Sequence, residues 1–209
     1  MVAHNQWQVW KAAEFARALG TSENTARPYL DILAGAYMVR VLPPWFENLK
    51  KRQVKAPKIY IRDSGLFHSL MQVSTLEELQ GHPKIGASWE GFLLEHVIDA
   101  LRTRDAYFWA THAGAELDLM VTIKGKRYGF EFKYADAPGR KKSMHIAIED
   151  LGLEHLWVIY PGDQKYPLDE KITVIPMEEL SNLFGSSPKE LIQIKDSRIP
   201  GVQGSSEMK

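Results

Sequence analysis

Two acidic residues and a lysine lie in neighbouring segments whose spacing could bring their side chains together. The residue pattern of segments 116–123 and 126–133 predicts two strands joined by a Lys-Gly turn. With a two-residue turn, Asp118 lies directly opposite Glu131, and opposed residues of an antiparallel pair share one face, with Cβ atoms about 5 Å apart. Lys133 follows on the same face as Glu131. The hairpin therefore predicts two carboxylates and one ammonium group on a single surface.

Two opposed carboxylates repel each other unless a positive charge lies between them. A divalent cation is the simplest source of that charge, and carboxylate oxygens suit Mg²⁺ or Mn²⁺. Lys133 could then neutralise a phosphate group or help to orient an attacking water. An acid on the preceding helix would complete the site; we expect Glu90, with Glu95 as the alternative. The predicted metal ligands are thus Glu90, Asp118 and Glu131, and Lys133 is the predicted fourth catalytic residue.

The other face of the predicted hairpin is apolar, so the acids point away from one hydrophobic layer. Seven residues form that face: Leu117, Leu119, Val121, Ile123, Tyr128, Phe130 and Phe132. A three-residue loop in place of the two-residue turn would shift this register. The competing interpretation is a solvent-facing hairpin with cross-strand ion pairs, in which Lys133 lies opposite Glu116. In that interpretation the acids are structural.

An α/β domain is predicted around the hairpin. Apolar residues recur at three-to-four spacing through 87–101, which predicts an amphipathic helix that carries Glu90. Further elements are expected, namely strands at 107–110, 155–160 and 172–175 and a helix at 140–151. Because a helix and a strand follow the hairpin, a parallel crossover is expected there, which makes the sheet mixed.

A helix-turn-helix pattern occupies the N-terminal part of the chain. Residues 12–19 predict a helix, a glycine follows, and Ser22 is a suitable N-cap for a second helix from Glu23. Segments 37–42 and 58–62 predict two paired strands, which together with the helices indicate a winged helix. The chain is thus expected to hold a winged helix at 1–62 and a connector at 63–83. An α/β domain at 84–177 and a C-terminal helix with a disordered tail at 178–209 follow.

Several basic residues and one histidine could take part in binding or be solvated. Pro28 argues against DNA recognition by the second helix, because proline kinks a helix and takes the place of a basic side chain. Two basic runs could contact phosphates: Lys50, Lys51, Arg52, Lys55, Lys58 and Arg62, and Arg140, Lys141 and Lys142. Structural roles are expected for His112 and Glu116.

The composition is that of a folded protein without charge bias. Of 209 residues, 44% are hydrophobic and 25% charged, and the 26 basic residues equal the 26 acidic ones. Any contact with DNA must therefore come from local basic patches. The lack of cysteine excludes disulfides and thiolate zinc sites. Because there is no membrane-length apolar run and no signal-peptide pattern, we expect a cytoplasmic protein without membrane contact.

The order of these acids resembles that of the PD-(D/E)xK nuclease superfamily, with an acid on a helix, an acid on a strand and Glu-x-Lys on the next strand. Five ordered segments are more specifically similar to the C-terminal half of uncharacterised bacterial AAA+ ATP-binding proteins: LGTSENTARPYLDIL, PKIYIRDSGL, GHPKIGASWEGFLLE, THAGAELDLM and YGFEFKYADAP. Those proteins place a winged helix and a nuclease-like domain after a P-loop ATPase. The resemblance implies a restriction-endonuclease-like (PD-(D/E)xK) α/β core. In it, Asp118 and Glu131 bind magnesium and Lys133 assists the hydrolysis of DNA.

The chain departs from that family pattern in lacking a P-loop. Gly81 and Gly86 have the glycine spacing of such a loop, but Ala87 and Ser88 follow in place of Lys-Ser or Lys-Thr. ATPase activity is therefore not expected, and a P-loop ATPase domain or subunit is an expected partner. Three hypotheses remain: a magnesium-dependent DNA nuclease, a catalytically silent module that docks on DNA or on a protein, and a plain winged-helix regulator. The sequence does not fix the oligomeric state or the strandedness of a substrate.

Overall fold

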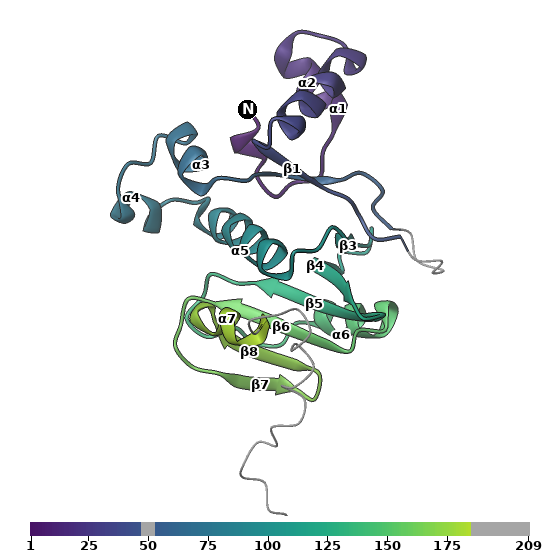
Figure 1. Cartoon of the computed structure of the whole chain (residues 1–209). Helices are drawn as coiled ribbons and strands as arrows, with labels where there is room; N and C mark the ends of the chain where they lie inside the picture. Colours follow the sequence, from purple (N-terminus) through teal and green to yellow (C-terminus); the bar gives the residue numbers. More distant parts are fainter. Residues whose placement is uncertain (47–52, 185–209) are drawn as a thin grey trace, which may run out of the picture.

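A computed structural model of the chain describes residues 1–46 and 53–184 (Figure 1). The predictions for Lys50, Lys51 and Arg52, and the tail expected at 185–209, lie outside the described residues. Within the described ranges, no helix is long and apolar enough to cross a membrane.

Two consecutive helices open the N-terminal unit. Helix α1 (Ala12–Leu19) ends at Gly20, whose φ of 65° is a left-handed conformation that glycine adopts without strain. Helix α2 (Glu23–Gly35) begins after Ser22, as the sequence predicts. Pro28 lies inside α2 without ending it. The two helices therefore form as expected. Pro28 removes one backbone hydrogen-bond donor, but α2 continues past it.

A two-stranded antiparallel sheet packs against these helices. Strands β1 (Val39–Leu42) and β2 (Lys58–Ile61) pair along their whole length. β1 starts two residues later than expected, because Tyr37 has a φ of 59° and turns the chain out of α2. Side chains from both helices and both strands form a shared core: Phe15, Ala26, Leu30, Val39 and Ile59.

Short helices flank this unit. η1 (Ala3–Asn5) precedes it, and α3 (Ser64–Leu70) and α4 (Leu76–Gln80) follow it. The sequence prediction missed α4, although its capping box is a recognisable signal. The Thr75 side chain accepts a hydrogen bond from the Glu78 backbone, and the Glu78 side chain accepts one from the Thr75 backbone.

The C-terminal part of the chain is built on a mixed six-stranded sheet. Its order is β3-β4-β5-β6-β8-β7. β3, β4 and β5 are antiparallel neighbours, β5, β6 and β8 run parallel, and β7 returns antiparallel at the far edge. The strands span Ala106–Ala110 (β3), Glu116–Ile123 (β4), Lys126–Phe132 (β5), His155–Tyr160 (β6), Tyr166–Asp169 (β7) and Ile172–Pro176 (β8). The expected parallel crossover is confirmed, and β7 is an addition that the sequence analysis missed.

Helices cover both faces of this sheet (Figure 1). Helix α5 (Ile85–Leu101) lies on one face together with α7 (Leu180–Phe184), which follows the short η2 (Met177–Glu179). Helix α6 (Lys142–Leu151) lies on the other face and connects β5 to β6. The architecture is therefore three layers, with α5 between the sheet and the N-terminal unit.

The hairpin of β4 and β5 has the predicted turn and register. Lys124 and Gly125 both have positive φ, at 50° and 77°, as a two-residue turn of the primed type requires. Ile123 pairs with Lys126, and the register continues as far as the pair of Leu119 and Phe130.

A bulge in β4 changes which side chains share a face. Two β4 residues, Asp118 and Leu119, lie opposite the single β3 residue Phe108. As a result, Leu117 packs with Met120 under α6, whereas Leu119 packs under α5. The prediction that Leu117 shares the face of Leu119 is therefore wrong, because one extra residue reverses the alternation.

Residues 43–45 and 53–54, which lie between β1 and β2, run along the edge of the large sheet. Pro44 forms a parallel bridge with Phe108, and Gln53 forms an antiparallel bridge with Thr111. The Gln53 side chain also accepts a hydrogen bond of 3.1 Å from the Trp109 indole. The N-terminal unit therefore protects the β3 edge. It is joined to the sheet by these bridges and this hydrogen bond as well as by the connecting chain.

Candidate functional site

Three buried acids and two lysines from five places in the chain meet beside the bulge. Glu90 comes from α5, Asp118 from β4 and Glu131 from β5. Lys133 follows β5 directly, and Lys58 comes from β2 of the N-terminal unit. The three acids and Lys58 are all less than 8% exposed. The structure thus brings the four predicted site residues into one cluster and adds a fifth charged group.

Lys133 lies between two of the acids. Its Nζ is 3.1 Å from Asp118 Oδ2 and 2.5 Å from Glu131 Oε2. The backbone N–H of Phe132 donates a second hydrogen bond, of 2.9 Å, to Asp118 Oδ2. The Lys133 ammonium group therefore supplies the positive charge that we expected from a divalent metal ion. Glu116 does not pair with Lys133, contrary to the simple ion-paired hairpin; it binds Lys58 instead.

Glu90 is held from the side of the N-terminal unit. The Tyr60 hydroxyl donates a hydrogen bond of 2.8 Å to Glu90 Oε1, and Lys58 Nζ lies 3.6 Å from the same oxygen. The sequence analysis missed both residues and placed Lys58 in a basic run. The sequence shows only that Lys58 and Tyr60 alternate with isoleucines, whereas the burial of all four strand residues follows from the fold.

Burial sets the charge of the acids. It raises the pKa of Glu131 to about 8, and the negative charge of Asp118 adds to this shift. It likewise raises the pKa of Glu90 to about 7, although the Lys58 ammonium opposes the shift. For Asp118, the effect of burial is outweighed by Lys133, Lys58 and the Phe132 N–H, and its pKa falls below the usual value. Near neutral pH the cluster thus holds one firmly ionised carboxylate and two that can be protonated.

The pKa of each lysine is raised above its usual value. In both cases burial disfavours the charged form, but the carboxylates around the ammonium groups outweigh it. Both lysines therefore remain positively charged near neutral pH. The two charges compensate the acids, so the cluster can exist without a metal ion.

The donor set suits a hard cation, but the side chains are not yet arranged around one. Glu131 Oε1 is buried and lacks a hydrogen-bond partner among the described residues, so one carboxylate oxygen is available for a ligand. Across those same residues, no three His, Cys, Asp or Glu side chains are grouped so that they could hold a metal ion. A cation between Asp118 and Glu131 would require the Lys133 ammonium to move away. Its side chain is 23% exposed, which gives it a route toward solvent.

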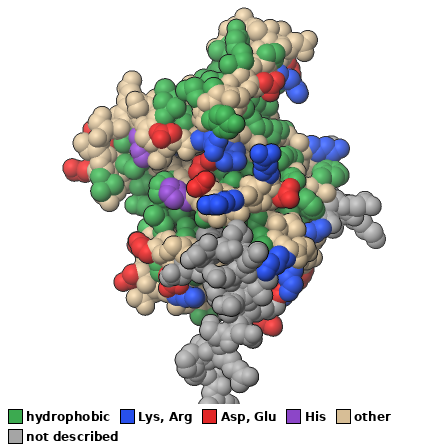
Figure 2. All heavy atoms as spheres, in the orientation of Figure 1, with side chains coloured by type: hydrophobic (Ala, Val, Ile, Leu, Met, Phe, Trp, Pro, Cys, Tyr) green, Lys and Arg blue, Asp and Glu red, His purple; other side chains and the backbone are tan. Residues whose placement is uncertain are grey.

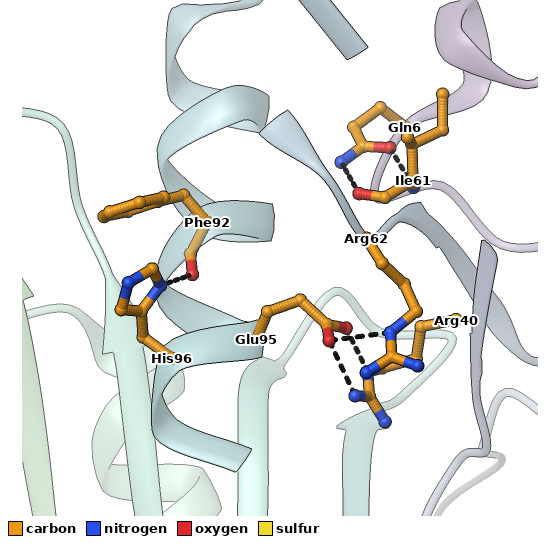
Figure 3. Close-up of polar contacts among 7 residues, drawn as sticks. All are labelled: Gln6, Arg40, Ile61, Arg62, Phe92, Glu95 and His96. Atoms are coloured by element: carbon orange, nitrogen blue, oxygen red, sulfur yellow. Dashed lines mark hydrogen bonds and ion pairs between the residues drawn. The ribbon is translucent and has the colours of Figure 1, made fainter. Parts of the chain in front are cut away.

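The alternative ligand Glu95 lies elsewhere. Figure 3 shows its carboxylate facing two arginines of the N-terminal sheet. Arg40 makes two hydrogen bonds to Glu95, one of them 2.7 Å long, and Arg62 Nε makes one of 2.9 Å. Glu95 therefore joins α5 to β1 and β2 rather than joining the acid cluster. His112 is exposed in the turn between β3 and β4.

The predicted basic runs are partly used inside the protein. Of the first run, Lys58 is buried and Arg62 is ion-paired, while Lys55 lies 5.3 Å from the centre of the Phe46 ring. Of the second run, Arg140 pairs with Asp169 at 3.3 Å. On the face drawn in Figure 2, lysines and arginines lie among acidic side chains rather than in one basic field.

Comparisons with known proteins match both parts of the chain. Residues 1–77 match a domain of unknown function, DUF8612, and residues 85–180 match a second, DUF4143. Uncharacterised proteins of Mycobacterium bovis and Mycobacterium tuberculosis are each 44% identical to this chain over 194 residues. That alignment covers 93% of this chain but only 44% of each relative, so the mycobacterial proteins are much longer. No solved structure has significant similarity to the chain. The chain is thus similar to two domains of unknown function and, separately, to part of two uncharacterised mycobacterial proteins.

Proposed function

We propose that this chain carries a magnesium-dependent DNA nuclease site of the PD-(D/E)xK type, joined to a winged helix. The observation that supports the proposal most directly is the convergence of Glu90, Asp118, Glu131 and Lys133 in one buried cluster. These residues come from a helix, a bulged strand and the next strand, in the order that the superfamily resemblance implies. An isolated ion-paired hairpin would need no third acid from a helix.

Each residue has a defined part in this proposal. Asp118, Glu131 and Glu90 would hold the cation, which when bound stabilises charge on a phosphate and acidifies a coordinated water. The pKa values of Glu131 and Glu90 lie near neutral, so both carboxyls can lose their protons to become ligands. Lys133, displaced from the two carboxylates, is left with a positive charge near the partly exposed rim. There it would neutralise the scissile phosphate or orient the attacking water.

The test combines metal binding with cleavage. Mg²⁺ and Mn²⁺ are titrated into the purified chain by calorimetry, and single-stranded, duplex and branched DNA are then offered as substrates. We expect Asp118→Asn to abolish metal binding and cleavage, and Lys133→Ala to abolish cleavage. Because Lys133→Ala removes the ammonium that competes with the cation, this variant should still bind the metal. Absence of metal binding at millimolar concentration would refute the nuclease proposal.

A second candidate function is a catalytically silent docking module. It is favoured by the two lysines, which already compensate the acids, and by large apolar side chains exposed on and after α2. Ile32 is 64% exposed and Tyr37 is 76% exposed. Where such side chains form one contiguous patch, they commonly mark a protein interface. A P-loop ATPase domain or subunit is the partner that the resemblance implies, and the mycobacterial relatives are long enough to contain one.

The two candidate functions differ in their dependence on Lys133. A docking module should bind DNA or its partner equally well with and without Lys133→Ala, and Ile32→Asn should weaken only the protein contact. A nuclease should lose cleavage in the first variant and keep it in the second. Binding that survives both substitutions would count against the α2 surface as the docking site.

A further inference from the structure

The strand β2 of the N-terminal unit reaches the acid cluster with two polar side chains. Tyr60 is fully buried, and its hydroxyl hydrogen-bonds to Glu90 at 2.8 Å. Lys58, two residues earlier on the same strand, lies between Glu90 and Glu116. We propose that the cation site is shared by the two parts of the chain, with Tyr60 as the residue that positions Glu90 as a ligand. This inference rests on the proposed cation site.

The packing around Glu90 supports a positioning role. Glu90 is on a helix and could adopt several rotamers, but one of its oxygens is already bound by Tyr60. The hydrogen bond comes from a neutral hydroxyl, so it orients the carboxylate without taking the place of a metal ion. Lys58 Nζ lies 3.6 Å from this same oxygen, and in the proposed site the other oxygen, Oε2, would be the metal ligand. Partners of this kind typically change metal affinity 10- to 100-fold when they are removed.

Close contact between β2 and α5 keeps Tyr60 in place. A Cβ atom added at Gly91 would lie 2.5 Å from the Gln6 amide and 3.7 Å from the Tyr60 ring. Gln6 in turn accepts a hydrogen bond of 2.7 Å from the Ile61 backbone (Figure 3). Gly91, the residue after Glu90, therefore lets β2 approach the helix at the site itself.

Ion pairs one turn further along α5 also hold the N-terminal sheet close to this helix. Glu95 receives hydrogen bonds from Arg40 on β1 and from Arg62 directly after β2 (Figure 3). The charged side chains are partly buried, with 15% exposure for Glu95 and 21% for Arg40. Multiple bonds to a carboxylate of low exposure are stronger than an ordinary surface pair. This contact therefore holds the N-terminal sheet against the helix that carries Glu90.

The experiment measures Mn²⁺ affinity by electron paramagnetic resonance and calorimetry in the full chain. Tyr60→Phe removes one hydroxyl and no charge, and we expect about a 10-fold loss of Mn²⁺ affinity. The matched control is Tyr166→Phe, which removes a tyrosine hydroxyl bonded at 3.0 Å to Pro138 on the far edge of the sheet. It should leave the affinity unchanged. Thermal unfolding of each variant identifies the temperature range in which both remain folded.

A double-mutant cycle separates positioning from general structural damage. If Tyr60 acts through Glu90, adding Tyr60→Phe to Glu90→Gln should cause no further loss of Mn²⁺ affinity. An undiminished effect in that background would overturn the inference. Glu95→Gln provides an independent variant should Tyr60→Phe fail to fold, and a loss of affinity in the same direction is expected.

The outcomes distinguish this inference from the proposed function. Wild-type binding of Mn²⁺ with unchanged affinity in Tyr60→Phe and Glu95→Gln would overturn the shared site and leave the nuclease proposal standing. Absence of Mn²⁺ binding in the wild type would overturn both. Loss of affinity in Tyr60→Phe and Glu95→Gln, but not in Tyr166→Phe, would support both.

Discussion

At the scale of single residues, the acid cluster is a balance between burial and charge. Burial raises the pKa of Glu131 to about 8 and of Glu90 to about 7, whereas the lysines hold the pKa of Asp118 below its usual value. A cation that binds all three must displace the protons of the first two. We therefore expect Mg²⁺ affinity to rise from pH 6 to pH 8.5 and to level off above that, because the acids are then ionised.

Calorimetry in buffers with different ionisation enthalpies would count the protons released on Mg²⁺ binding. Release should be greatest at pH 6, where both carboxyls are mostly protonated, and should fall as the pH rises through their pKa values of about 7 and about 8. Affinity that stays constant across this range would show that the two carboxyls are not ligands or are already ionised.

The same pKa values predict how the stability of the metal-free chain depends on pH. The folded state keeps a proton on Glu131 up to about pH 8, whereas the unfolded chain loses it near the ordinary value of 4.5. Between those values the folded state binds more protons, so its free energy of unfolding falls as the pH rises. Glu90, with a pKa of about 7, acts in the same direction.

Denaturant unfolding at pH 7 and pH 8.5 would test this dependence. We expect wild type to lose stability over this interval and Glu131→Gln to lose less, because glutamine does not titrate. Glu149→Gln, at an exposed acid on α6, serves as the control and should retain the wild-type slope. A steeper slope in Glu131→Gln than in wild type would contradict the assignment.

The sequence predicts the part of the site that is local. The sequence alone predicts that Asp118 lies near Glu131, because a two-residue turn fixes the register of one hairpin. It does not predict that Lys58 and Tyr60 join the site, since they come from a distant strand and meet Glu90 only through tertiary packing. The β4 bulge could not be predicted either, because its extra residue does not interrupt the alternation of polar and apolar residues in the sequence around Asp118.

At the scale of elements, helix α5 connects the sheet to the N-terminal unit, and two of its glycines test that contact. Gly86 has open space where a Cβ would be added, whereas a Cβ at Gly91 would lie 2.5 Å from the buried Gln6 amide. Alanine favours a helix over glycine by up to about 1 kcal/mol. Gly86→Ala should therefore stabilise the chain or leave it unchanged. Gly91→Ala should destabilise it by about 1–3 kcal/mol through overpacking.

Chemical denaturation of the two alanine variants compares the same substitution in the same helix. If Gly91→Ala gained as much stability as Gly86→Ala, the approach of β2 to α5 would be looser than the structure indicates. The bounds of α5, and of most other elements, were predictable because each carries its own periodicity or turn. The relative placement of the elements was not, because it depends on such close contacts.

At the scale of the whole molecule, one strand belongs to more than one core. Along β2, Ile59 packs in the core of the N-terminal helices, Tyr60 packs in the core under α5, and Ile61 packs with Phe67 of α3. A strand shared in this way cannot leave one core without disturbing the others. The two parts of the chain are therefore expected to unfold together rather than as independent domains.

Differential scanning calorimetry with a substitution far from the site tests this coupling. Leu30 is 7% exposed in the core of α2, and Leu30→Ala should cost about 2–5 kcal/mol. If the parts are coupled, the single transition moves to lower temperature as a whole, and its calorimetric and van't Hoff enthalpies stay equal. Two separate transitions, with only the first moved by Leu30→Ala, would mean that β2 detaches while the sheet remains folded. Tyr60 would then be withdrawn from Glu90 whenever the N-terminal unit opened, and cation binding would fail before the sheet melts.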